Sequence, residues 1–540
     1  MKNYVIVGGV AGGMSAATRL RRLDEQANII VFERTDYVSF ANCGLPYYVG
    51  GVITERDALL LQTPESLNRR FGLDVRVGHE VVAIDRAAQS VRVRELATGE
   101  EFDESYDALV LSTGAAPVTP PIPGIERALR LRDIADVDKM AAAANAVPSS
   151  AVVIGAGFIG LEVAENLSFR DIPTTVVEMA DQVLTPLDPE MAAPVADELR
   201  RHGIEVLTGA GVSEITDTEV VLDDGRRLPA ELVVASIGVR PDSHLAAEAG
   251  LELNDRGGII VDEQQRTSDP LIFAVGDAAT KRDAIDDSQV LVPLAQTANR
   301  HGRLVADVLT GRDTASMPVL GTAIVKVFDL TAASTGWNEK RLREAGRNYR
   351  AIHTHPSDHA GYYPGAQQMS LKLLIGADTD LILGAQGVGP SGVDKRIDVI
   401  ATAIRGGITA SGLADLELAY APPFGSAKDP INMLGMIADN LAHGYADSIQ
   451  WHELAEAQQA GAVVIDVRTP GEFARGAIPG AINIEVDALR ERFDEIPSGE
   501  LIVHCQVGLR GHTAARLLEG LGRPARNLDG GYKTWAAGCR

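Results

Sequence analysis

The sequence predicts an α/β protein built from several domains, and three observations support this fold class. The chain has 540 residues, enough for three or four domains of about 150 residues. An apolar strand, a glycine-rich turn and a helix follow one another at the start of the chain and again near residue 150. A third α/β pattern, with the apolar segments VVIDV and LIVHC, runs to the C-terminus.

The repeated strand–turn–helix pattern is explained most simply by a second nucleotide-binding unit inserted into a first one. A mixed α+β segment with the strand-like stretches SLKLLIGA and LILGAQGVG follows, and the pattern changes again near Gly444. The predicted parts are the first unit (1–148), the inserted unit (149–245), the completion of the first unit (246–318), the α+β domain (319–445) and the C-terminal α/β domain (446–540).

Composition excludes several classes of partner. The chain carries 50 basic and 74 acidic side chains, a net charge of −24, whereas nucleic acids and anionic membranes bind broad basic surfaces. No apolar run reaches the ~18 residues of a membrane span, and the N-terminus enters a strand without a signal peptide. Three cysteines, none in a CxxC pair, suit a reducing compartment. We therefore expect a cytoplasmic protein without nucleic-acid or membrane partners.

The first glycine turn reads GGVAGG over residues 8–13, between the strand YVIV and a helix. Backbone N–H groups and the positive helix end at such a turn face a pyrophosphate. Val10 replaces the second glycine of the GxGxxG signature, but Glu33 ends the next strand 25 residues after Gly8, where a ribose-binding carboxylate is expected. The sequence predicts a dinucleotide site here; an ordinary strand–helix turn is the alternative.

The second glycine turn carries the complete signature GAGFIG over residues 155–160. Glu178 ends the following strand, 23 residues after Gly155. Its carboxylate would accept a hydrogen bond from a ribose 2′-OH and repel a 2′-phosphate, which favours NADH over NADPH. A second flavin site and a vestigial fold are the alternatives.

Two dinucleotide sites in one chain suggest electron transfer from a nicotinamide to a flavin. Small-residue turns end the strands in LVLSTGAAP and FAVGDAA, and an Asp at such a point can bind ribityl hydroxyls. The order of these motifs over about residues 1–440 resembles the flavoprotein disulfide reductases that use pyridine nucleotides, which implies FAD and NAD(P)H. The predicted cofactor-binding residues are Gly8, Val10, Ala11, Gly12, Gly13, Glu33, Arg34, Thr113, Gly114, Gly155, Gly157, Phe158, Ile159, Gly160, Glu178, Gly276 and Asp277.

Cys43 lies in the string SFANCGLPYY, where Gly44 and Pro46 predict a turn into a helix. A thiol at a helix start meets N–H donors and the helix dipole, which favour the thiolate; a buried inert cysteine is the alternative. No second cysteine follows nearby, so no local disulfide can form. Cys43 must then cycle through a mixed disulfide with a small thiol, a persulfide or a sulfenic acid.

The strings SFANCGLPYY and GGVAGG resemble those of the coenzyme A-disulfide reductases. This resemblance implies that coenzyme A contacts Arg19, Arg22, Ser39, Asn42 and Lys428. It also implies a homodimer in which Tyr420 and Tyr362, the latter preferred to Tyr363, reach the flavin–thiol site of the partner subunit and donate a proton. The histidines of HTHPSDH (residues 353–359) are expected in a solvated loop, and no metal site is predicted.

Cys505 ends an apolar strand and precedes a loop and a helix. A loop that curls its N–H groups round one sulfur stabilises a thiolate or persulfide, and Arg510 adds a charge. With RTPGEFARGAIPGAINI and LDGGYKTW, this loop resembles a rhodanese, a sulfurtransferase domain. The rival signature of cysteine phosphatases, HC-x5-R, would need an arginine at position 511, where the chain has Gly511.

The predicted function is FAD-dependent reduction of coenzyme A disulfide, persulfide or polysulfide by NADH. Cys43 would be the redox-active thiol, and Cys505 would accept sulfane sulfur. An NADH oxidase or peroxidase with a sulfenic acid at Cys43 is the first alternative, and a redox sensor without catalysis is the second. The coenzyme A-binding cations and the rhodanese-like segment favour the reductase.

Overall fold

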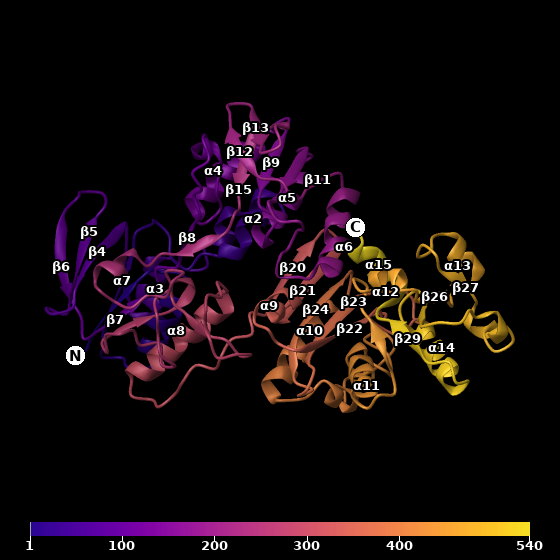
Figure 1. The fold of residues 1–540 in the computed structure, drawn as a ribbon. Helices are drawn as coiled ribbons and strands as arrows, with labels where there is room; N and C mark the ends of the chain where they lie inside the picture. Colours follow the sequence, from indigo (N-terminus) through magenta and orange to yellow (C-terminus); the bar gives the residue numbers. More distant parts are fainter. Residues whose placement is uncertain (1) are drawn as a thin grey trace. The chain divides into compact units, whose positions relative to one another are not determined.

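The computed structural model describes residues 2–540 and divides into two compact units. Unit 1 comprises Met1–Met179 and Gly203–Gly321, and unit 2 comprises Ala180–His202 and Thr322–Arg540. The segment Ala180–His202 lies inside the predicted inserted nucleotide unit but packs with the later part of the chain. The ribbon in Figure 1 follows the chain by colour from indigo to yellow.

Unit 1 is built on two parallel sheets. The first has the order β17-β7-β1-β2-β3, so the strand of the FAVGDAA segment completes the N-terminal sheet, as the insertion hypothesis predicts. The second has the order β11-β10-β9-β15. The strands are β1 Asn3–Val7, β2 Asn28–Glu33, β3 Asp74–Val77, β7 Ala108–Leu111 and β17 Ile272–Ala274, then β9 Ala151–Ile154, β10 Thr174–Val177, β11 Glu205–Leu207 and β15 Leu232–Ala235.

Strand β1 shows why these apolar runs fold as central strands. Tyr4 and Ile6 point to one face and pack with α1 and α8, while Val5 and Val7 point to the other face and pack against β4 and β5. Both faces are covered, so the run is continuously apolar. The helices of unit 1 are α1 Ala11–Leu23, α2 Leu45–Val49, α3 Pro64–Phe71, α4 Ile134–Asn145, α5 Phe158–Ser168, α7 His244–Glu248 and α8 Ala295–Leu309.

Small antiparallel elements complete unit 1. Two three-stranded sheets have the orders β4-β5-β6 and β12-β13-β14, and two strand pairs are β8 with β16 and β18 with β19. These strands are β4 His79–Asp85, β5 Ser90–Glu95, β6 Glu101–Ser105, β8 Ala115–Pro117, β12 Val212–Ile215, β13 Glu219–Leu222, β14 Arg227–Pro229, β16 Val239–Pro241, β18 Lys281–Arg282 and β19 Gln289–Val290.

Unit 2 begins with a five-stranded antiparallel sheet of order β20-β21-β24-β23-β22. Helices α10 and α11 bury one face of this sheet in a shared apolar core, and α6 contacts β20, β21 and β24. The predicted strands SLKLLIGA and LILGAQGVG are β23 and β24. The elements are β20 Ala323–Val327, β21 Leu330–Gly336, β22 Tyr349–Thr354, β23 Ser370–Gly376, β24 Ile382–Gly389, α6 Pro189–Arg201, α9 Glu339–Glu344, α10 Val393–Gly406 and α11 Pro430–Ala442.

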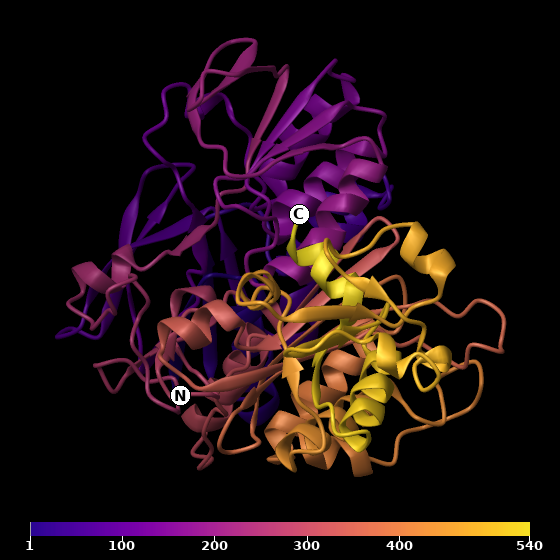
Figure 2. The ribbon, with the colours of Figure 1, turned by 45° about the vertical axis from the view of Figure 1, so that its right-hand side comes forward.

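The C-terminal domain of unit 2 is a five-stranded parallel sheet of order β25-β29-β28-β26-β27 with one apolar cluster on each face. It is the yellow-orange part of Figure 2, where helices flank the strands. The predicted strands VVIDV and LIVHC are β26 and β28. The elements are β25 Ser448–Ile449, β26 Val463–Asp466, β27 Ile482–Asn483, β28 Leu501–His504, β29 Ala525–Leu528, α12 Leu454–Gln459, α13 Pro470–Ala474, α14 Leu509–Gly520 and α15 Gly531–Gly538.

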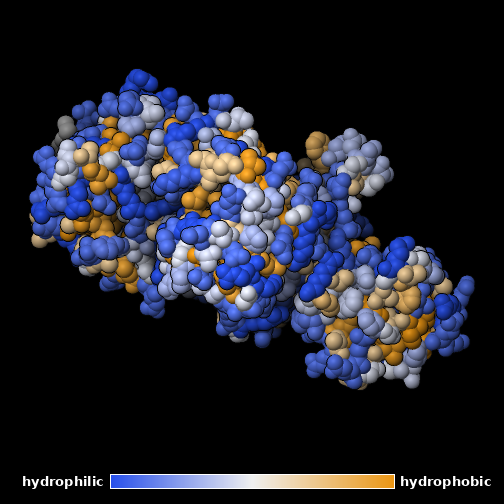
Figure 3. Space-filling view, turned by 90° about the horizontal axis from the view of Figure 1, so that it is seen from above, coloured by the Kyte–Doolittle hydropathy of each residue, from blue (hydrophilic) through white to orange (hydrophobic). Residues whose placement is uncertain are grey.

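The surface fits the acidic, hydrophilic composition. On the face drawn in Figure 3, hydrophilic residues surround the scattered hydrophobic ones. Within residues 2–540, no helix combines the length and the apolar composition that crossing a bilayer requires.

Candidate functional site

The first glycine loop connects β1 to α1 and depends on two glycines for close packing. Gly8 has a φ of +100°, and a Cβ there would lie 2.1 Å from the carbonyl oxygen of Ser112. A Cβ on Gly13 would lie 2.0 Å from the oxygen of Gly8. Glu33, at the end of β2, accepts a hydrogen bond from the Gly9 N–H at 2.8 Å. This carboxylate therefore holds the loop in shape.

The second glycine loop, between β9 and α5, repeats this geometry. A Cβ on Gly155 would lie 2.4 Å from the Ser236 oxygen, and Glu178 accepts a hydrogen bond from the Ala156 N–H at 2.7 Å. Gly157 differs, because a Cβ there would meet no atom within 4 Å. The backbone at Gly157 is thus open to a ligand at the start of a helix, and this space fits a dinucleotide pyrophosphate.

A buried lysine beside Asp277 was missed in the sequence analysis. Asp277 lies in the short 3-10 turn Gly276–Ala278 after β17, and burial raises the pKa of its carboxyl group. The Lys281 side chain is 2% exposed and donates hydrogen bonds to the carbonyl oxygens of Gly276 (2.5 Å) and Ala279 (2.9 Å). Burial lowers the pKa of Lys281 to about 8. The only feature of the sequence that could have indicated Lys281 is its position four residues after Asp277.

Cys43 lies in the 3-10 turn Asn42–Gly44 directly before α2, and its side chain is exposed. The expected stabilisation of its thiolate is absent: partial desolvation by the surrounding protein, and then the carboxylates of Glu162 and Asp277, raise the pKa of the thiol. The physical reason is that α2 has five residues and a correspondingly small dipole, which burial and two negative charges outweigh.

Glu162 connects the two nucleotide-binding regions of unit 1. It lies on α5, in the helix that follows the second glycine loop, and accepts a hydrogen bond from the Tyr47 hydroxyl on α2 at 3.1 Å. Burial raises the pKa of the Glu162 carboxyl group. Sequence reasoning did not identify Glu162, because nothing in GLEVAENL shows that this helix face meets the segment after Cys43.

The residues expected to bind coenzyme A have different surroundings. Arg19 is already paired with Asp307 at 2.8 Å, whereas Arg22 is exposed and lies 5.9 Å from the centre of the Phe71 ring. Ser39 has a φ of +48° and donates its N–H to the Gly9 oxygen at 2.8 Å, which brings the irregular segment before Cys43 against the first glycine loop. In unit 2, the Lys428 side chain is exposed.

The two tyrosines of unit 2 meet each other. The hydroxyl oxygens of Tyr362 and Tyr420 are 2.9 Å apart, and this hydrogen bond raises the pKa of Tyr362. Both side chains are exposed. Tyr363 instead contacts the edge of the His359 ring, at 5.6 Å between centroids. Of the two neighbouring tyrosines, Tyr362 is therefore the one paired with Tyr420.

Cys505 lies at the end of β28 with its thiol buried. The loop after it curls back, and the Gly508 N–H donates a hydrogen bond to the sulfur at 3.2 Å. Gly508 has a φ of +97°, which glycine alone adopts without strain. The guanidinium of Arg510 is paired rather than free: it donates two hydrogen bonds, of 2.7 and 2.8 Å, to the carboxylate of Glu472. Arg510 in turn lowers the pKa of Glu472 to about 2.

The segment Asp529–Lys533 packs against the Cys505 loop and is hydrogen-bonded to its backbone. The N–H groups of Tyr532 and Lys533 donate to the carbonyl oxygens of Cys505 (2.8 Å) and Gln506 (3.0 Å). A Cβ on Gly531 would lie 2.5 Å from the Cys505 oxygen. Gly531 therefore lets this segment approach the thiol loop, while Gly530 makes room for Thr534 and His353.

The prediction that the HTHPSDH histidines lie in a solvated loop is wrong. His353 ends β22, is buried, and bonds through Nδ1 to Asp529 (2.6 Å) and through Nε2 to Glu190 (3.0 Å). His355 is also buried and bonds to Thr534 at 2.8 Å. These side chains are buried because the C-terminal domain packs on β22, a contact that local sequence does not reveal.

Glu190 joins this junction to a second buried cation. Lys372 lies between Asp188 (2.8 Å), Glu190 and Glu339 (3.3 Å) and is fully buried. These carboxylates outweigh desolvation and raise the pKa of Lys372. The three carboxylates are close enough to hold a metal ion, but the ammonium of Lys372 already lies among them and binds all three.

Comparison with known proteins agrees with this geometry. Residues 2–302, more than half of the chain, match the pyridine nucleotide-disulphide oxidoreductases, and residues 322–429 match the dimerisation domain of the same family. The chain belongs to this family. Residues 450–538 match the rhodanese-like domain. The pyridine nucleotide-disulphide oxidoreductase fold, with a dimerisation domain and a C-terminal rhodanese domain, confirms the predicted fold class.

Relatives within the family cover either about four fifths of this chain or nearly all of it. A coenzyme A disulfide reductase of Staphylococcus aureus is 37% identical over 440 residues, 81% of this chain and 99% of that protein. The reduced CoADR-RHD of Bacillus anthracis is 47% identical with a TM-score of 0.98, over 99% of this chain and 98% of that one. A NAD-dependent persulfide reductase from A. fulgidus is 40% identical with a TM-score of 0.93, over 99% and 100% of the two chains.

Membership in this family makes the chain an NAD(P)H-dependent flavoprotein oxidoreductase. The two glycine loops, each at a helix start with a carboxylate at the end of the next strand, fit FAD and a nicotinamide dinucleotide. Asp277 lies half-buried in the turn after β17.

Proposed function

We propose that this enzyme reduces coenzyme A disulfide and coenzyme A persulfide with NADH, and that its rhodanese domain supplies sulfane sulfur to the same reaction. One observation carries the proposal: of the three cysteines, only Cys43 belongs to unit 1, and it is exposed. Without a neighbouring thiol, Cys43 forms no local disulfide, and a mixed disulfide with a small thiol is the oxidised form that we propose. The identity to a coenzyme A disulfide reductase and a persulfide reductase supports this choice.

Unit 1 would hold the two cofactors at its two glycine loops. The first loop with Glu33 and Asp277 would bind FAD, and the second loop with Glu178 would bind NADH. A flavin bound there supplies two-electron transfer between nicotinamide and sulfur. Lys281, buried beside Asp277, would keep positive charge near the flavin site and hold the Gly276–Ala279 turn through its two backbone hydrogen bonds.

At Cys43, the thiolate would attack one sulfur of coenzyme A disulfide. This step forms a Cys43–coenzyme A disulfide and releases one coenzyme A thiolate. Two electrons from NADH then cleave the mixed disulfide and return the Cys43 thiolate, and one proton completes the second coenzyme A thiol. With coenzyme A persulfide, attack on the inner sulfur forms the same mixed disulfide and releases hydrosulfide.

The elevated pKa of Cys43 in the protein chain makes substrate binding important for this step. The exposed Arg22 and Lys428 would bind phosphates of coenzyme A, together with Ser39 and Asn42, which both precede Cys43 in the chain. The protein would act as a homodimer, in which the hydrogen-bonded Tyr362–Tyr420 pair of one subunit supplies a proton to the thiolate released in the other.

The test is the replacement of Cys43 by serine, with NADH consumption measured anaerobically on coenzyme A disulfide and persulfide. We expect loss of at least 95% of both activities, on the order of a 20-fold or greater effect on kcat, because no other thiol of unit 1 can replace it. FAD should remain bound. Cys539→Ser, at the other exposed cysteine, is the matched control and should keep full activity.

Retained sulfur-dependent activity in Cys43→Ser would contradict the proposal. Wild-type enzyme that consumes NADH faster with oxygen or peroxide than with any sulfur substrate would favour the oxidase or peroxidase alternative.

A further inference from the structure

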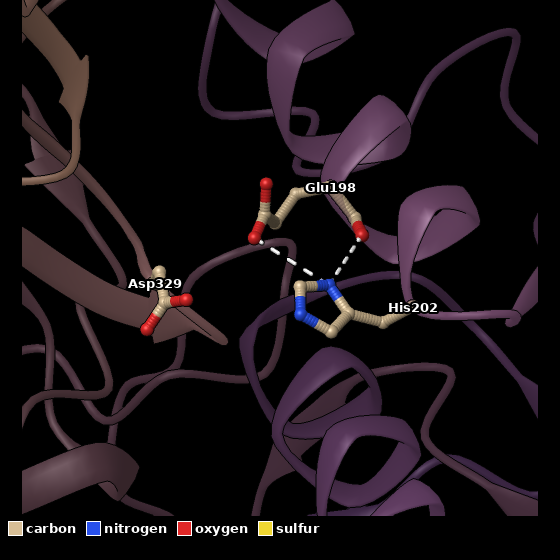
Figure 4. Close-up of side chains that lie close together, drawn as sticks. All are labelled: Glu198, His202 and Asp329. Atoms are coloured by element: carbon tan, nitrogen blue, oxygen red, sulfur yellow. Dashed lines mark hydrogen bonds and ion pairs between the residues drawn. The ribbon is translucent and has the colours of Figure 1, made fainter.

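We propose that Glu198, His202 and Asp329 form a binding site for a divalent first-row cation such as Zn²⁺. Figure 4 shows the three side chains, two from the end of α6 and one from the turn between β20 and β21. One ligand atom of each lies within 4.8 Å of the others. All three belong to unit 2 and are independent of the reduction chemistry.

The helix places two of the ligands on one face. Glu198 and His202 are four residues apart, a spacing that brings side chains together on an α-helix. Asp329 comes from a different element, so the three donors converge from two sides (Figure 4). An imidazole with two carboxylates suits Zn²⁺ and neighbouring transition metals better than Ca²⁺, which takes six to eight oxygens.

Glu198 has a buried oxygen without a hydrogen-bond donor. The residue is 2% exposed, and its Oε2 pairs with Arg201. Within residues 2–540, no group donates a hydrogen bond to Oε1, which lies 3.5 Å from Nδ1 of His202. A buried carboxylate oxygen without a hydrogen-bond donor destabilises the folded protein, because its lost hydration is not replaced. A bound cation would replace that lost interaction.

The imidazole of His202 is oriented as metal ligands are. Its Nδ1 lies 3.0 Å from the backbone carbonyl oxygen of Glu198 and donates to it, which leaves the Nε2 lone pair free to bind a metal. The ring also stacks on Phe328, at 3.8 Å between centroids and 3° between planes. Phe328 has a φ of +51°, a strained value for a bulky residue, so the turn holds this stack at some cost.

The three side chains line a hollow of about 360 Å³. This volume leaves room for the water ligand that completes a tetrahedral ion held by three protein donors. A bound ion would link the end of α6 to the hairpin of β20 and β21, which α6 already contacts. The ion would therefore stabilise the packing of Ala180–His202 in unit 2.

The test is calorimetric titration of the FAD-loaded, full-length enzyme with Zn²⁺ at neutral pH. Cys43, Cys505 and Cys539 are first replaced by serine, because thiolates bind Zn²⁺ themselves. We expect one Zn²⁺ per chain. His202→Asn and Asp329→Asn should each weaken the affinity at least tenfold. His443→Asn is the matched control, since His443 pairs with Asp439 at the same helical spacing and, within residues 2–540, no second carboxylate completes a site there.

Thermal unfolding gives a second readout that does not depend on calorimetry. Zn²⁺ should raise the Tm of the cysteine-free parent and of His443→Asn, and should leave the Tm of Asp329→Asn unchanged, because an ion stabilises only the state that binds it. Asp329 is exposed in a turn, so its substitution should not prevent folding. Absence of saturable binding in the parent, or binding that both site variants retain, would overturn the proposal.

Discussion

One carboxylate is hydrogen-bonded to each of the two glycine loops in the same manner. Glu33 and Glu178 each end a parallel strand and accept a hydrogen bond from the glycine loop of their own sheet, at 2.8 and 2.7 Å. Glu33 also accepts hydrogen bonds from the N–H and the hydroxyl of Thr35, both at 2.9 Å. Ligands of open α/β sheets bind in the crevice beyond the strand ends, so we expect these two carboxylates to influence cofactor preference.

Glu178 leads to a prediction about cofactor choice. The 2′-phosphate of NADPH would lie against this carboxylate, and the repulsion should cost about 1–3 kcal/mol, a 5- to 150-fold preference for NADH in kcat/KM. Glu178→Ala should lower the ratio of kcat/KM with NADH to kcat/KM with NADPH. Glu205→Ala, at the opposite end of the neighbouring strand β11, should leave it unchanged. Equal kcat/KM values for NADH and NADPH in the wild-type enzyme would refute this assignment.

At the scale of elements, the junction between β22 and the rhodanese domain rests on a buried ion pair. Burial alone would lower the pKa of His353, but the carboxylates of Asp529 and Glu190 outweigh it and raise the pKa to about 9. The imidazole is then protonated at neutral pH. Because Asp529 begins the segment that supports the Cys505 loop, the same pair connects the antiparallel sheet to the sulfur site.

Removing the imidazolium should loosen this junction. His353→Asn leaves Asp529 as a buried charge without its imidazolium partner, which typically costs about 3–5 kcal/mol, whereas Glu190 keeps its ion pair with Lys372. We expect faster hydrogen exchange in the Asp529–Lys533 segment and reduced sulfur transfer by Cys505, with reduction of coenzyme A disulfide retained. His359→Asn is the control, since His359 bonds to the Ala360 carbonyl within its own segment. Unchanged exchange in His353→Asn would contradict the role of this pair.

The same pair predicts how stability depends on pH. A group whose pKa rises on folding contributes its full stabilisation below its unfolded pKa, about 6.5, and loses it as the pH rises through the folded value, about 9. The urea midpoint of the wild-type enzyme should therefore fall between pH 6.5 and about pH 9.5. In His353→Asn this fall should be smaller, and identical pH profiles for the two proteins would count against the assignment.

At the scale of the whole molecule, two thiols with different environments share one chain. Cys43 is exposed and belongs to the reductase region, whereas Cys505 is buried and its sulfur accepts a hydrogen bond from the Gly508 N–H of the following loop. An exposed thiol suits exchange with a small disulfide, and an N–H-lined pocket suits a bound persulfide. A covalent connection raises the effective concentration of one site at the other to roughly millimolar values when the geometry permits transfer.

If Cys43 exchanges with small disulfides and Cys505 carries the persulfide, the two activities should respond differently to Cys505→Ser. The variant should reduce coenzyme A disulfide at the wild-type rate and should lose most of its activity on polysulfide, together with sulfur transfer from thiosulfate to a thiol. Both activities are measured on the same preparation, so that a folding defect would show as a loss of both. Unchanged polysulfide reduction would place the rhodanese domain outside the main route.

The sequence alone determined the features that depend on local pattern. Apolar runs with glycine turns predicted the strands β1, β9 and β28 and the two glycine loops, because strand–turn–helix packing restricts these positions to small residues. The lone Cys43 and the Cys505 loop were likewise visible, since each lies in a distinctive short string. The fold class followed from the order of these motifs.

The tertiary structure decided what surrounds those motifs. Glu162 reaches Tyr47 across 115 residues of sequence, and His353 reaches Asp529 across 176, so no local pattern could indicate either contact. Neighbouring groups then set the chemistry. Partial desolvation and the carboxylates of Glu162 and Asp277 raise the pKa of Cys43 against the helix-start expectation, and the carboxylates of Asp529 and Glu190 keep the buried His353 charged at a domain junction. The charge and solvation of a side chain depend on neighbours that only folding brings together. Local sequence therefore predicted the strands and glycine loops, whereas tertiary contacts determined the pKa values of the groups beside them.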